Sequence, residues 1–125
     1  MHVSELKLAE QVFLDTERLD EICARLGEGG AETAICTAME ELAELLQLAG
    51  GLRRAGQVDV LGKTAAEVKQ LAICIGMPGL ARVSDDVRSL CAGSDAAALA
   101  ATVARMRRLG EQSLLAMWDQ QDLTV

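Results

Sequence analysis

Glycine recurs along this 125-residue chain where helices would be expected to end, and this spacing constrains the fold more than any other feature. Between most of the glycines, apolar residues recur every three or four positions, which is the period of one helix face. Glycine ends helices readily because it adopts the left-handed conformation that other residues avoid. The pattern predicts five helical segments, namely 10–26, 31–55, 58–75, one from Pro78 to Cys91, and one capped by Ser94 that ends near Gln120.

Each segment carries an apolar stripe that we expect to face a common core. In the first two segments this stripe is Val12, Leu19, Ile22, Leu26, Ile35, Ala38, Leu42, Leu45, Ala49 and Leu52. In the third it is Leu61, Ala65, Val68, Ala72 and Ile75. In the last two it is Leu80, Val83, Val87, Leu90, Leu99, Val103, Met106, Leu114, Met117 and Trp118.

Short connections between these segments predict an all-α, up-and-down four-helix bundle over about residues 29–120. The first segment is expected to be an additional N-terminal helix, and residues 1–125 a single domain. Phe13 and Trp118 are the chain's aromatic residues, so the core must be built from Leu, Ala, Val, Ile and Met. That composition is typical of packed helices and not of a β-sandwich. A helical hairpin that dimerises across a two-fold axis is the alternative.

Charge and hydropathy narrow the classes of function. With 12 basic and 19 acidic residues the net charge is −7, which disfavours nucleic-acid binding. The apolar runs are too short for a membrane span, and the first residues do not resemble a signal sequence. We therefore expect a cytoplasmic protein that binds neither nucleic acid nor membrane.

Residues suited to metal binding or catalysis are few and scattered. The cysteines, at positions 23, 36, 74 and 91, form no C-x-x-C pair, and the single histidine is His2. We expect buried thiols without disulfides, no metal, no cofactor and, in the absence of a Ser-His or Cys-His arrangement, no enzymatic activity. A carboxylate cluster in the second segment is expected to be a solvated face; its members are Glu32, Glu40, Glu41 and Glu44.

The third segment carries the most informative motif. At 100° per residue, Gly62, Ala66, Lys69 and Ile73 share a face beside the core stripe, and Gln70 lies at its edge. The run A-A-E-V-K-Q-L-A-I-C-I-G, residues 65–76, resembles the signature A-H-x-x-K-G-x-x-x-x-x-G of histidine-containing phosphotransfer (HPt) domains. Ala65, Lys69 and Gly76 match in register. The phosphoacceptor histidine is replaced by Ala66, and the glycine after the lysine by Gln70.

The resemblance implies an HPt-like bundle that takes part in two-component signalling. A methyl side chain cannot accept a phosphoryl group, so it implies binding without transfer, as a regulator or scaffold. The implied partner is a receiver domain of a response regulator or a histidine kinase, and the implied contact residues are Gly62, Ala66, Lys69, Gln70 and Ile73. The alternative is a structural or assembly bundle, unrelated to phosphorelay, that forms a homodimer through the third segment.

Overall fold

A computed structural model describes residues 12–124, with side chains described for residues 12–120. This part of the chain contains helices and no strands. The helices are α2 (Thr16–Arg54), α3 (Val58–Cys74), α4 (Pro78–Cys91) and α5 (Ala96–Thr124). The predicted all-α class is confirmed.

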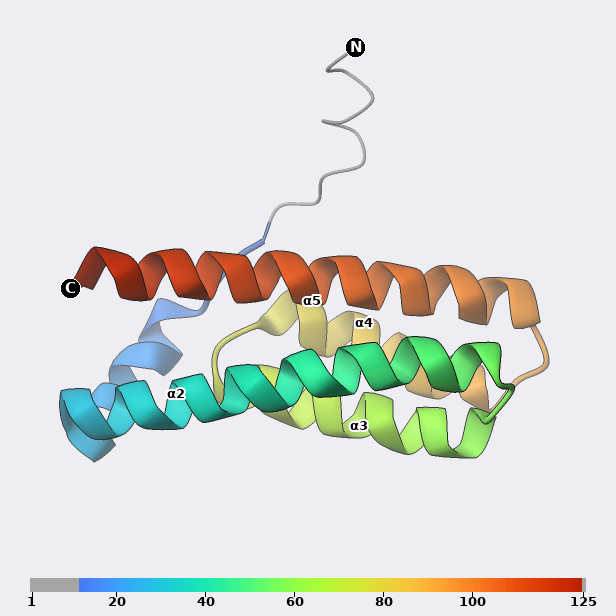
Figure 1. Cartoon of the computed structure of the whole chain (residues 1–125), viewed down its shortest axis with the longest axis horizontal. Helices are drawn as coiled ribbons and strands as arrows, with labels where there is room; N and C mark the ends of the chain where they lie inside the picture. Colours follow the sequence, from blue (N-terminus) through green and yellow to red (C-terminus); the bar gives the residue numbers. More distant parts are fainter. Residues whose placement is uncertain (1–11, 125) are drawn as a thin grey trace, which may run out of the picture.

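The helices form a closed ring in which each packs against two neighbours. Consecutive helices run in opposite directions, and α5 returns along α2 (Figure 1). Among the described residues the diagonal pairs, α2 with α4 and α3 with α5, make no contact. This is an up-and-down bundle, and α5 forms one edge of it along its whole length (Figure 1).

Helix α2 is interrupted at Gly27, whose φ of 75° and ψ of 168° are not helical. The arm before the break, residues 16–26, is the additional N-terminal helix that the sequence predicts. It starts at Thr16 and not at residue 10, because the Asp15 carboxylate accepts a hydrogen bond from Arg18 N at 3.2 Å and so caps the helix. Residues 10 and 11 lie outside the described part of the chain. Asp15 N also donates to Gly76 O at 2.8 Å, which fixes the arm to the turn after α3.

The turns before and after α3 lie at glycines, as the glycine spacing in the sequence predicts. Gly56 and Gly76 have φ values of 72° and 75°, a conformation that costs glycine little. Pro78 occupies the first turn of α4, where its missing N–H is not needed. The predicted cap of α5 was Ser94, but Asp95 takes that role. Its Oδ1 accepts from Ala98 N at 2.9 Å, because Asp95 directly precedes the first helical residue.

The core is largely the predicted one. Every stripe residue of the third segment is buried. The prediction that Leu26 and Trp118 lie in the core is wrong, because they are 52% and 54% exposed. Leu26 directly precedes the break at Gly27, and Trp118 is turned 100° from the buried Met117. The half-buried members of the predicted stripes pack against the core from its edges; they are Val12, Leu45, Leu52, Leu90 and Leu114.

The predicted burial of the thiols is also wrong. Cys23 and Cys74 are exposed, Cys36 and Cys91 are half-buried, and none of the four forms a disulfide. Cys23 lies on the outer side of the first arm, and Cys74 is the last residue of α3, so neither faces the core stripe. The four glutamates of the acidic cluster are exposed, as expected.

Among the described residues, no group of three or more His, Cys, Asp or Glu side chains is placed to hold a metal ion, and His2 lies outside this part of the chain. No described helix combines the length and apolarity that a membrane crossing requires.

Candidate docking face on helix α3

The five residues singled out on the third segment lie on α3 in two groups. Gly62, Ala66 and Lys69 are half-buried on the side of the helix that turns toward α4, whereas Gln70 and Ile73 are exposed. Ile73 keeps 49% of its surface exposed, so it offers an apolar contact to solvent. Of the five residues, Gln70 and Ile73 are the most accessible, and the other three lie at the border with α4.

An ion-pair cluster occupies the border between α3 and α4. Asp85 Oδ1 accepts hydrogen bonds from Lys69 Nζ at 3.1 Å and from Arg88 Nε and Nη2 at 3.1 and 2.8 Å. The hydrogen bonds from Arg88 and then from Lys69 hold the pKa of Asp85 below its ordinary value of 3.8. Asp85 is therefore ionised at neutral pH, and the three side chains together carry one excess positive charge.

Toward the other end of this border, α3 comes close to α4 at Gly62. A Cβ at Gly62 would lie 3.6 Å from Cys91 Cβ, so the two helices are in van der Waals contact there. Burial raises the pKa of the Cys91 thiol, and the negative charge of Asp59 raises it further. The thiol is protonated at neutral pH, so it is a poor nucleophile.

The chemistry available on this face is that of binding. Ala66 offers a methyl group where a phosphoacceptor would need an imidazole nitrogen, and no described residue is a histidine. What remains is a partly neutralised cationic cluster on one side of Ala66 and an exposed aliphatic side chain, Ile73, one turn beyond Lys69. Charged rims beside apolar contacts are typical of protein interfaces.

Sequence reasoning missed Asp85 and Arg88. Their spacing of three residues on one helix is a recognisable ion-pair signal. The pairing of Asp85 with Lys69 also follows from the tight turn at Gly76, because that turn fixes the antiparallel register of α3 against α4. The register brings Lys69 opposite Asp85 and Gly62 opposite Cys91.

A groove of about 190 Å³ lies elsewhere, where the two arms of α2 meet the end of α3. Its floor is apolar and includes Ile22, Ile35 and Ile75, with Arg18 and Arg25 among its lining residues. Arg18 Nε donates to Cys74 O at 3.0 Å and so links the first arm to α3. The groove is smaller than ordinary small-molecule pockets, which exceed about 300 Å³. It contains none of the five residues of the α3 face.

Comparisons with known proteins add no relative to this description. No family model matches the chain, and no match was found among curated proteins or solved structures.

Proposed function

We propose that this chain is an HPt-like binding module in two-component signalling, which engages a receiver domain or a histidine kinase without accepting phosphate. It would act as a regulator or scaffold of that partner. The proposal rests on Ala66, which replaces the expected nucleophile one turn before Lys69, on the helix that also carries the exposed Ile73. Gly62, Ala66, Lys69, Gln70 and Ile73 are the proposed contacts.

The charge at this face supports an acidic partner. The whole chain carries a net charge of −7, whereas the Lys69, Asp85 and Arg88 cluster carries one excess positive charge. The side chains of Lys69 and Arg88 are 32% and 52% exposed, so their charge reaches solvent. A local cationic site on an acidic protein orients an approaching acidic surface and raises the association rate.

The apolar part of the face supports a helical or flat partner surface. Ile73 supplies an exposed aliphatic contact, and the small Gly62 and Ala66 leave the surface beside it low. Helices can approach closely over such small residues. Affinity would come from burial of Ile73, and orientation from the charge cluster.

The proposal is tested by titrating the isotopically labelled chain with receiver domains and histidine-kinase cores from its source cell and following the amide shifts. We expect shifts clustered at Gly62, Ala66, Lys69, Gln70 and Ile73 with at least one of them. Absence of shifts with all of these domains, or shifts confined to other helices, would overturn the proposal.

Two substitutions test the assigned contacts. Lys69→Glu should weaken the complex about tenfold, because it reverses the steering charge. Arg54→Glu makes the same charge change at the exposed end of α2 and should alter the affinity less than about twofold. Ile73→Ser changes an exposed side chain, leaves the fold intact and should also weaken the complex. Equal effects of the two charge reversals would show that the attraction is not local to α3.

A further inference from the structure

Helix α5 has two faces with the spacing of a helix seam. Its inward face packs into the core through Leu99, Val103, Met106, Ser113 and Met117. The opposite side carries a second series, spaced alternately by three and four residues, and every member is exposed. We call it the outer seam; it consists of Ala101, Ala104, Arg108, Glu111, Leu115 and Trp118.

The outer seam has large apolar residues at one end and small ones at the other. Leu115 is 64% exposed and Trp118 is 54% exposed, and they lie three positions apart on one side of the helix. Ala101 and Ala104 lie about three turns earlier on the same side. Spacing by alternate threes and fours is the pattern that lets two helices pack side by side along a shared seam.

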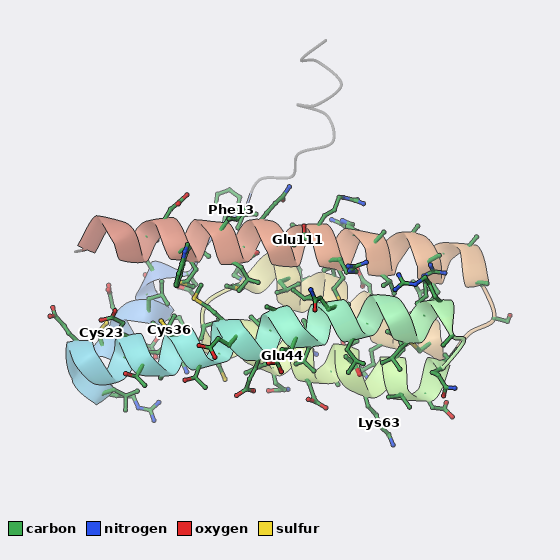
Figure 2. All side chains as sticks on the ribbon, viewed as in Figure 1. Phe13, Cys23, Cys36, Glu44, Lys63 and Glu111 are labelled. Carbon is green, nitrogen blue, oxygen red and sulfur yellow. The ribbon has the colours of Figure 1, made fainter. Side chains whose placement is uncertain are left out.

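The middle of the seam carries two opposite charges. Glu111 lies about midway along α5 (Figure 2), and Arg108 precedes it by one turn. Among the described residues neither side chain forms an ion pair. Both are therefore available to a partner of opposite charge.

We propose that the outer seam is the contact surface of a two-fold symmetric homodimer in which α5 packs antiparallel against α5 of a second copy. In antiparallel register, Arg108 of each copy lies opposite Glu111 of the other, which makes two equivalent ion pairs. In the same register Leu115 lies opposite Ala104 and Trp118 opposite Ala101. Large residues thus meet small ones along the whole contact, and the surface is complementary to itself.

The charges also select this orientation over the parallel one. A parallel, in-register pair would place Arg108 against Arg108 and Glu111 against Glu111, so that both contacts would be repulsive. It would also crowd the two Trp118 rings together and leave the alanines facing each other across a gap. Polar residues within an otherwise apolar seam commonly set orientation and register in this way.

The expected dimer is modest in size. From Ala101 to Trp118 the seam extends about 26 Å along the helix, at 1.5 Å per residue. One helix pair with two large apolar residues per copy corresponds to the lower end of interface areas, so we expect a dissociation constant in the micromolar range. The second copy does not cover the α3 face, so this proposal is independent of the partner proposed there.

Sedimentation equilibrium of the full chain, from about 1 µM to about 1 mM, tests the proposal together with the fluorescence of Trp118, the chain's one tryptophan. We expect a monomer–dimer equilibrium and a blue shift of the emission with the same midpoint, because the indole leaves water in the dimer. A chain that stays monomeric at 1 mM would overturn the proposal, and so would dimerisation without a change in the emission of Trp118.

Charge reversal tests the register. Arg108→Glu and Glu111→Arg should each weaken the dimer at least about tenfold, because each turns both ion pairs into repulsions. The double variant R108E/E111R restores opposite charges and should return the affinity to within a few-fold of the original. If the single variants dimerise normally, or if the double variant remains as weak as they are, the antiparallel register is wrong.

A matched pair of leucines tests the apolar contact. Leu115→Ser should weaken the dimer at least about tenfold, whereas Leu48→Ser, at a leucine of α2 that is 49% exposed, should leave it unchanged. Both sites are on the surface, so both variants should fold. Equal weakening by the two variants would contradict a contact through α5.

Discussion

The α3 face and the outer seam of α5 both combine charged side chains with exposed apolar ones, but they differ in where the charges find partners. On α3, Lys69 is paired within the chain to Asp85, which also holds Arg88. On α5, Arg108 and Glu111 form no ion pair with any described side chain. The charges of the α3 cluster are thus largely paired with one another, whereas Arg108 and Glu111 on α5 are exposed.

This difference shows what a shared helix face can and cannot reveal. Spacing along α3 places Lys69 beside Ala66 and Ile73, but it does not tell whether the charge is satisfied by a neighbouring helix. That depends on the register of α3 against α4, which the turn at Gly76 sets. On α5 the outer seam has the same kind of spacing, but its residues are exposed because the opposite side of the helix packs into the core.

The largest expected difference between the α3 face and the outer seam is in how a larger side chain changes the free energy of unfolding. Gly62→Leu should lower the free energy of unfolding by about 1–3 kcal/mol, because the added side chain meets Cys91 on α4. Ala104→Leu, on the exposed seam, should change it by less than about 0.5 kcal/mol in dilute solution. Denaturant unfolding at low protein concentration measures both.

Gly62→Ala is the control for the first of these variants. Its Cβ would sit at an ordinary contact distance of 3.6 Å, and alanine favours a helix by about 1 kcal/mol over glycine. It should therefore leave stability unchanged or raise it. A large loss of stability with Gly62→Ala would show that α3 and α4 are packed too closely at Gly62 to accept a methyl group. No loss of stability with Gly62→Leu would show that there is open space at this point.

The thiols offer a second, smaller contrast. At pH 8, Cys91 on the α3–α4 border should react with iodoacetamide about tenfold more slowly than the exposed Cys74, because burial raises its pKa and limits access. Peptide mass spectrometry after timed alkylation measures both rates in one sample. Equal rates would mean that the α3–α4 border is solvated at that point.

The smallest expected effect concerns acid. Because Asp85 has a lowered pKa in the folded chain, its contribution to stability is present above its ordinary value of 3.8 and is lost as the pH falls through the lower folded value. Asp85→Asn should therefore flatten the fall in stability below about pH 4. Urea midpoints between pH 2 and pH 7 measure it, and an Asp85→Asn curve as steep as the original would contradict the prediction.

Most of the fold follows from the sequence. The stripe from Leu61 to Ile75 predicts the apolar residues that are buried along α3, because a regular helix between two turns fixes which residues share a face; the buried Thr64 was not predicted. The predictions fail at helix ends and on α5. The first helix begins after its cap at Asp15, which is later than the apolar pattern predicts. Trp118 is predicted to be buried because it is large, apolar and next to the core stripe, but it is exposed.

The candidate site was predictable only in part. The spacing predicts that Gly62, Ala66, Lys69 and Ile73 share one side of a helix, with Gln70 at its edge, and the structure contains that helix. The ion-pair partner of Lys69 lies 16 residues away, on another helix, and depends on tertiary register. The spacing of the outer seam of α5 can be seen in the sequence. That this seam is exposed follows only from the structure, which shows the opposite face of the helix buried.

The contact between α2 and α5 has a consequence for the order of folding. The other contacts in the ring join helices that are consecutive along the chain, whereas this one closes a loop that contains the whole α3–α4 hairpin. Closing such a loop costs entropy before its contacts form, so we expect this joint to form late. The two helices approach closely at Gly110, where the Leu46 side chain occupies the space that a Cβ would need. Changes there should shorten the lifetime of the folded chain more than they slow its formation.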